Sequence, residues 1–164
     1  MTTRRPRNNA ARGDLLKYFL AKFFLLAMNS GADPVGTDAS KIDEIRGRKY
    51  KILVIDDRDD FRKSFCFKLR RKYNAEVEDV NSGKAGIEKL IDGNSYDFIF
   101  TDIMMPGMTG IEVYHELRRI GSNIRIVIMS AYSNSDEWKK AQALNVPLLH
   151  KPISDDLLIK VLGA

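Results

Sequence analysis

The sequence has 164 residues, of which 44% are hydrophobic and 30% are charged. This length suits one ordinary domain with an appendage, and the apolar content is typical of a globular protein with a packed core. The single cysteine, Cys66, excludes an internal disulfide framework. The net charge of +5 lies entirely in residues 1–28, which hold six basic side chains and one acidic one. Because the rest of the chain is balanced, we expect no direct binding of nucleic acid by its body.

The N-terminal region predicts an appendage in three parts. Residues 1–13 are rich in Arg and Asn and predict a disordered basic arm. Residues 14–28 place apolar side chains at helical spacing and predict an amphipathic helix, which is too short and too charged to span a membrane. Gly, Pro, Ser and Asp accumulate in residues 29–46, which we expect to be a linker.

The apolar face of the helix predicted over residues 14–28 needs a partner, because its phenylalanines are costly to leave in water. Four partners stay open at this point: the rest of the chain, a second copy in a homodimer, a helix of a partner protein, or an anionic membrane surface.

Residues 47–164 predict a single α/β domain, because short apolar strands alternate five times with helices. Such alternation favours a doubly wound, five-stranded parallel sheet with right-handed crossovers. The expected strands are 51–55, 76–80, 97–101, 123–129 and 146–149. The expected helices are 59–73, 82–91 and 110–120, a fourth from Ser133 or Ser135 to 144, and a last one capped by Ser154.

Polar side chains follow four of the predicted strands. They are Asp56 with Asp57, then Asp102, Ser130 and Lys151. Because ligands of parallel sheets gather at the carboxyl ends of the strands, we expect these groups to share one crevice. Carboxylates brought so close favour a hard divalent cation such as Mg²⁺. A lysine, a hydroxyl and a metal together match the needs of phosphoryl transfer, in which a carboxylate is able to serve as the nucleophile.

The sequence resembles response-regulator receiver domains of two-component signalling, of the chemotaxis-regulator type. Four motifs carry the resemblance: ILVIDD (52–57), FIFTDIMMPGMTG (98–110), IVIMSAYS (126–133) and KPI (151–153). It covers roughly residues 49–164, and DxxMPxMxG after an apolar strand is a specific signal. The resemblance implies a flavodoxin-like (βα)5 receiver fold, to which the N-terminal amphipathic helix is an addition.

The resemblance also implies a role for each matching residue. Asp102 is the expected phosphoacceptor. Mg²⁺ is expected to bind Asp56, Asp57, Asp102 and the backbone carbonyl of Met104. Lys151 is expected to pair with Asp102 and then with the phosphoryl group.

Three further positions follow from the same comparison. Ser130 is expected to hydrogen-bond the phosphoryl group, and the Lys151–Pro152 bond is expected to be cis. Leu148 stands at the switch position, where the family usually has an aromatic ring. The usual coupling of phosphorylation to output is therefore in doubt.

The expected function is a phosphorylation-dependent switch in a phosphorelay. A sensor histidine kinase or a phosphotransfer protein would donate the phosphoryl group in the cytoplasm. The protein would catalyse only its own phosphorylation and dephosphorylation, so we do not expect an enzyme in the ordinary sense. Bulky residues at Met104 and Tyr132 favour slow dephosphorylation.

Two alternatives remain. One is a phosphorylation-independent pseudo-receiver that only binds partners. The other is an aspartate-nucleophile phosphatase, which usually has a second acid where this chain has Met104. The chain stops at Ala164 without a DNA-binding module, which favours a stand-alone receiver or a truncated chain.

Overall fold

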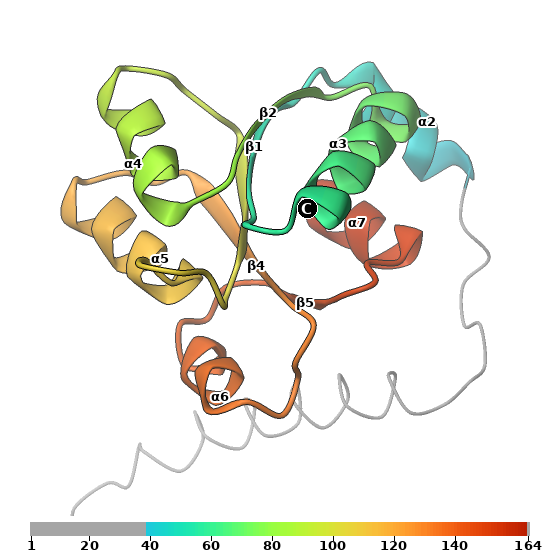
Figure 1. Ribbon diagram of the computed structural model, residues 1–164. Coiled ribbons are helices and arrows are strands. Elements are labelled where there is room, and N and C mark those ends of the chain that lie inside the picture. The colour runs from blue at the N-terminus through green and yellow to red at the C-terminus, as the bar shows by residue number, and fades with distance from the viewer. Residues whose placement is uncertain (1–38, 164) are drawn as a thin grey trace, which may run out of the picture. The chain divides into compact units, whose positions relative to one another are not determined.

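The computed structural model describes residues 39–163, which form an α/β domain (Figure 1). Its strands are β1 (Lys51–Ile55), β2 (Glu76–Val80), β3 (Phe98–Asp102), β4 (Arg125–Ser130) and β5 (Leu148–His150). Its helices are α2 (Ala39–Gly47), α3 (Asp59–Tyr73), α4 (Gly83–Ile91), α5 (Gly110–Arg119), α6 (Asp136–Gln142) and α7 (Asp155–Leu162).

The five strands form one sheet in the order β2-β1-β3-β4-β5, and every neighbouring pair is parallel. The expected doubly wound, flavodoxin-like sheet is therefore confirmed. The chain leaves β1 toward one edge of the sheet and then returns to place β3 on the other side of β1. This reversal opens a crevice at the carboxyl ends of β1 and β3, where such folds bind their ligands.

Helices cover both faces of the sheet, and the strands are apolar on both sides for that reason. In β1, Ile52 and Val54 pack in the core under α2, α3 and α7, whereas Leu53 and Ile55 pack under α4 and α5 (Figure 1). All four side chains are fully buried. Alternate side chains of β1 therefore pack into two separate cores, one on each face of the sheet, and both cores hold β1 in place.

Hydroxyl side chains begin four of the helices. Ser82, Thr109, Ser135 and Ser154 each accept a hydrogen bond from a backbone N–H in the first turn that follows. Of the two serines considered for the fourth helix, Ser135 is therefore the cap.

The last strand, β5, begins at Leu148, two residues later than expected. Pro147 has no N–H to donate to the ladder, although its carbonyl still accepts from Ile128 N at 2.9 Å.

The expected linker over residues 29–46 is wrong for its last part, because α2 is a helix that packs on α3 and α7. Ile45 is only 2% exposed and belongs to the core of that face. The Arg46 guanidinium donates to the carbonyl of Lys72 at 2.8 Å. The polar composition concealed two apolar side chains, Ile45 and the partly buried Ile42, that pack on this core. Tertiary contacts rather than helix propensity stabilise this short element.

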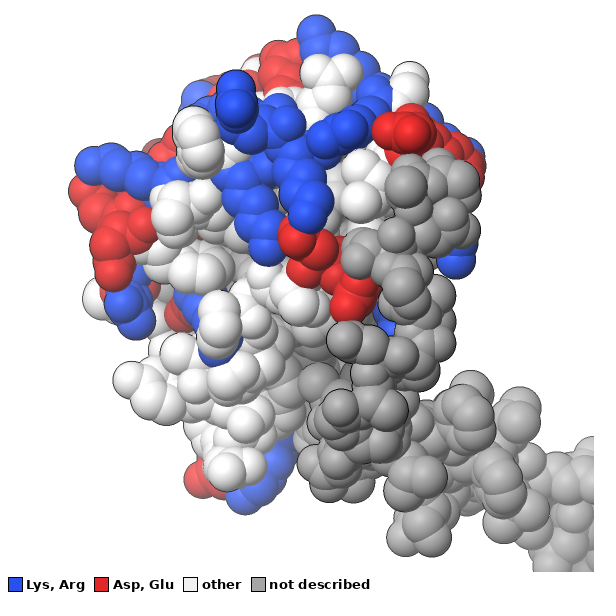
Figure 2. All heavy atoms as spheres, turned by 90° about the vertical axis from the view of Figure 1, so that its right-hand side faces the viewer, with Lys and Arg blue, Asp and Glu red and all other residues white. Residues whose placement is uncertain are grey.

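Charged side chains gather on the outer face of α2, α3 and α7 (Figure 2). Asp155 at the start of α7 pairs with Lys72 and, at 3.1 Å, with Lys68, and it accepts from the Tyr73 hydroxyl at 3.0 Å. Burial raises the pKa of Asp155, but these donors outweigh it and hold the pKa below its usual range. The network ties the start of α7 to the last turns of α3.

The structure describes no residue of the basic arm or of the helix predicted over residues 14–28, so both predictions lie outside the described part. From residue 39 to residue 163, no helix has both the length and the apolar character needed to cross a membrane.

If α2 is an integral part of the domain, shortening its buried side chain is expected to weaken the whole fold. Ile45→Ala is expected to lower the free energy of unfolding by about 2–4 kcal/mol, because it leaves a cavity in the core. The matched control is Ile91→Ala on α4, whose side chain is 66% exposed and is expected to change stability by less than about 1 kcal/mol. Denaturant unfolding measures both, and equal effects would show that α2 is only loosely attached.

Candidate functional site

Four strands deliver polar side chains to one edge of the sheet. Asp56 follows β1, Asp102 ends β3, Ser130 ends β4 and Lys151 follows β5. The parallel register brings these ends level, with Thr101 beside Ile55, Asp102 beside Met129 and Ser130 beside His150. All four polar side chains are buried. The convergence predicted from the sequence is therefore present in the fold.

The Lys151 ammonium lies between two carboxylates. Its Nζ donates to Asp56 Oδ2 at 2.6 Å and also hydrogen-bonds Asp102 Oδ1. The ion pairs join the ends of β1 and β3 to the segment after β5, and Lys151 N donates to the Ser130 carbonyl at 2.8 Å. The Lys151–Pro152 bond is cis. Lys151 is 9% exposed, so the three charged groups interact with little screening by water.

The free oxygens of both carboxylates bind backbone groups. Asp102 Oδ2 accepts from Met104 N at 2.8 Å, and Asp56 Oδ1 accepts from Arg58 N at 3.0 Å. At Gly110, a Cβ would stand 2.2 Å from the backbone oxygen of Asp102. Only glycine fits there, so the last residue of the MPGMTG motif lets α5 approach the end of β3 closely.

The site holds more negative than positive charge. Burial raises the pKa of the Asp102 carboxyl, and the hydrogen bond and charge of Lys151 oppose this effect only in part. One ammonium serves two buried carboxylates, and Asp57, the residue after Asp56, is exposed to solvent. Such an excess of oxygen anions is the environment that a hard divalent cation stabilises.

The carboxylates do not form a complete metal-binding cluster by themselves. Among residues 39–163, no three His, Cys, Asp or Glu side chains are grouped to hold one ion. Mg²⁺ suits such a place, because it keeps several waters and takes only one or two carboxylates together with phosphate oxygens. The residues present therefore fit this ion, with water and a phosphoryl oxygen supplying the remaining ligands.

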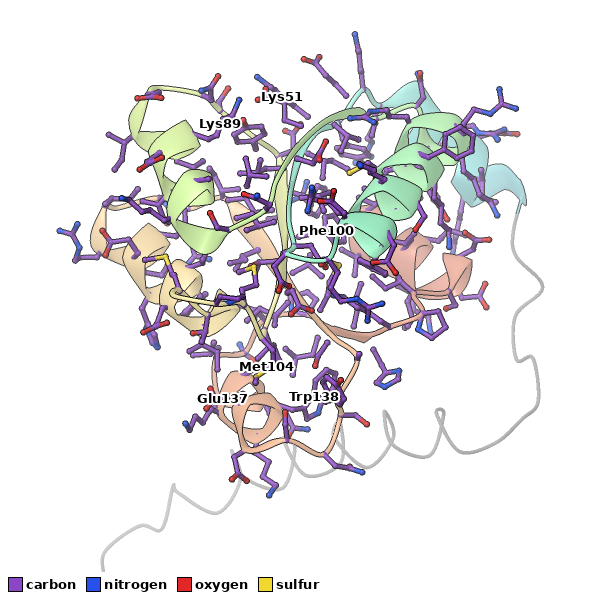
Figure 3. All side chains as sticks on the ribbon, viewed as in Figure 1. Lys51, Lys89, Phe100, Met104, Glu137 and Trp138 are labelled. Atoms are coloured by element: carbon purple, nitrogen blue, oxygen red, sulfur yellow. The ribbon has the colours of Figure 1, made fainter. Side chains whose placement is uncertain are left out.

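Ser130 contacts Lys151 through its backbone carbonyl, while its side chain bonds the loop that follows β4. Its hydroxyl accepts from Tyr132 N at 3.0 Å, which ties the strand end to the loop before α6. Met104 and this loop line a surface cavity of about 460 Å³. Figure 3 shows Met104 close to α6, which carries Glu137 and Trp138. Leu148 is half-buried and packs in a small cluster on α6 that includes Trp138. The predicted site residues thus divide into a charged centre and a hydroxyl-bearing loop next to it.

Sequence reasoning missed Arg62, which is 7% exposed and supports the site from α3. Its guanidinium donates to the Asp56 carbonyl at 2.7 Å and to Asp79 Oδ2 at 3.0 Å, and it pairs with Asp59. A signal was present in the sequence. Arg62 stands on the same helical stripe as the buried Phe65, Cys66 and Leu69, where a charged residue needs buried partners.

Comparisons with known proteins agree with this geometry. A family model described as the response regulator receiver domain matches residues 52–163. The two-component response regulator ORR42 of Oryza sativa subsp. japonica is 31% identical over 118 residues, covering 70% of this chain and 89% of that relative. Sporulation initiation phosphotransferase F of Bacillus subtilis (strain 168) is 31% identical over 110 residues, covering 65% and 85% respectively.

Among solved structures, the response regulator TrrA of Thermotoga maritima in complex with Mg(2+)-BeF is similar to this chain with a TM-score of 0.59 and 29% identity. The match covers 68% of this chain and 96% of TrrA. In other curated relatives the matched region makes up between 9% and 46% of the length. The family model spans well over half of the chain and includes all four strand ends of the site. The protein belongs to the response regulator receiver domain family.

Proposed function

We propose that this protein is a phosphorylation-dependent switch in which Asp102 accepts a phosphoryl group. The observation that carries the proposal is the Lys151 ammonium shared between the buried carboxylates of Asp56 and Asp102. A buried charge is expensive to maintain unless it is paired, and here two anions share one cation. The arrangement suits a centre that takes up a metal ion and a phosphoryl group and then redistributes its charges.

Each residue of the site has a proposed task. Asp56, Asp57, Asp102 and the Met104 carbonyl would hold Mg²⁺, which when bound neutralises charge on the phosphoryl oxygens. A carboxylate oxygen of Asp102 attacks phosphorus as the bond to the donor breaks, which leaves an aspartyl phosphate. Lys151 then pairs with a phosphoryl oxygen and stabilises the charge that develops there.

The output would run through Ser130 and the loop before α6. The Ser130 hydroxyl now bonds Tyr132 N, and donation to a phosphoryl oxygen would change that contact. Phosphorylation would then bias the surface around α6 and β5 between two arrangements.

The phosphoryl donor we propose is a sensor histidine kinase or a phosphotransfer protein in the cytoplasm. The name of the Bacillus subtilis relative, a sporulation initiation phosphotransferase, supports a place in such a relay. A homodimer contact or a membrane-surface contact through residues 14–28 also remains a proposal.

A second candidate is a pseudo-receiver that binds partners without phosphorylation. Leu148 favours it, because a leucine has no ring to swing inward and signal the state of the site. The complete charged centre argues for the switch instead. Phosphorylation of the purified chain by a small phosphodonor separates the two functions.

The first test replaces the proposed nucleophile. Asp102→Asn is expected to abolish the acid-stable, base-labile mass gain that acetyl phosphate and Mg²⁺ produce in the wild type. Without metal, the same variant is expected to unfold at a higher denaturant concentration, because it removes a carboxylate whose burial raises its pKa. Intact-mass spectrometry and denaturant unfolding measure the two effects. Undiminished phosphorylation of the variant would show that another residue is the acceptor.

The second test concerns the metal. Asp57→Ala is expected to weaken Mg²⁺ binding at least about tenfold, because Asp57 follows the buried Asp56 directly, is exposed to solvent and is a proposed ligand of the ion. Asp60→Ala is the matched control, because Asp60 already pairs with Arg58 at 3.1 Å. Titration calorimetry compares the two variants, and equal losses would mean that Asp57 has no special role.

The third test separates phosphorylation from its consequence. Lys151→Ala is expected to allow slow phosphorylation of Asp102 but to suppress the accompanying change around α6, because the ammonium links the phosphoryl group to β5. The fluorescence of Trp138 on α6 reports that change before and after phosphorylation. A full fluorescence response in this variant would contradict the role given to Lys151.

A further inference from the structure

An aromatic ring completes the surroundings of the Lys151 ammonium. Lys151 Nζ lies over the ring of Phe61, 4.2 Å from its centroid. An ammonium has three N–H donors, and here the carboxylates of Asp56 and Asp102 take two of them. The ring occupies another side of the same cation. A desolvated cation over an aromatic face is attracted by the negative potential of the ring.

The ring of Phe61 is itself held in place by a row of aromatic side chains. It stacks on Phe65, with centroids 5.5 Å apart and an interplanar angle of 18°. Phe65 in turn meets Phe100 of β3 edge-on, at 5.4 Å. Phe100 stands two residues before Asp102, so the same strand sets the position of the ring and of the nucleophile. The next residue, Arg62, anchors this turn of α3 to the Asp56 carbonyl.

We propose that Phe61 is a positioning residue that keeps the Lys151 ammonium in place while its carboxylate partners change. The inference rests on the proposed function. A metal ion and a phosphoryl group would both draw Asp56 and Asp102 away from the lysine. The ring carries no formal charge and offers no ligand to a metal ion. Its attraction for the ammonium therefore persists through the exchange and holds the lysine where the phosphoryl oxygens arrive.

The competing view is that Phe61 only fills space between α3 and the strand ends. Phe61→Leu distinguishes the two views, because leucine keeps an apolar side chain of similar reach but has no π face. Phe61→Tyr keeps the ring and is the rescue variant. Phe67→Leu is the matched control, because Phe67 lies on the same helix and its side chain is 65% exposed.

The kinetic test uses the full chain with saturating acetyl phosphate and Mg²⁺. Phe61→Leu is expected to lower the maximal rate of Asp102 phosphorylation about tenfold, with little change in the donor concentration at half-maximal rate. Phe61→Tyr is expected to stay within about twofold of the wild type, because the ring is kept. Phe67→Leu is expected to leave the rate unchanged. In a Lys151→Ala background, Phe61→Leu is expected to add no further loss, since the two residues act together.

An equal loss in both backgrounds, or a normal rate for Phe61→Leu, would overturn the proposal. A second readout needs no phosphoryl transfer. In proton NMR, the ring is expected to shift the ε-methylene signals of Lys151 upfield in the wild type and in Phe61→Tyr, but not in Phe61→Leu. Addition of Mg²⁺ is expected to preserve this shift. If Mg²⁺ abolishes it, the ring does not hold the lysine, whether or not the protein accepts a phosphoryl group.

Discussion

The ammonium of Lys151, set between Asp56 and Asp102, is the interaction on which the rest of the site depends. Two carboxylates and one lysine, all buried, are stable together only because each pairs with another. Removal of the lysine would leave two buried carboxylates without a cation. Removal of one carboxylate would leave one ammonium paired with one carboxylate. Without metal, the two buried carboxylates repel each other and one ammonium balances them only in part. Binding of Mg²⁺ or a phosphoryl group would change that balance of charge.

The fold buries these charged groups away from water and holds them in contact with one another. The apolar strands β1 and β3 lie side by side at the centre of the sheet, with a separate core on each face. Arg62 fixes the backbone beyond β1, and Gly110 lets α5 close on the end of β3. Because packed interiors adjust little, these supports leave the carboxylates few other positions to adopt.

The aromatic row from Phe100 to Phe61 joins the packed interior to the buried ammonium of Lys151. The other side of the site is built differently. There the Ser130 hydroxyl holds the loop before α6 through a hydrogen bond to Tyr132 N, and Leu148 packs with aliphatic and aromatic neighbours on α6. The proposed switch would use the two sides differently, with the packed side holding the charged groups and the loop side changing its contacts on phosphorylation.

The sequence by itself determined the alternation of strands and helices, the parallel sheet and the convergence of Asp56, Asp102, Ser130 and Lys151. These features follow from local periodicity and from the rule that parallel strands end at one edge. Only the tertiary structure decided which side chains touch. The helix α2 escaped notice because its mostly polar sequence is stabilised by the packing of its own Ile45, with Ile42, against core residues far away in the sequence. The contacts of Arg62 and Phe61 with the site depend on how α3 packs over β1 and β3. The helical stripe predicts that these side chains face the interior, but which partners they meet there depends on how the helix packs on the sheet, which local periodicity does not determine.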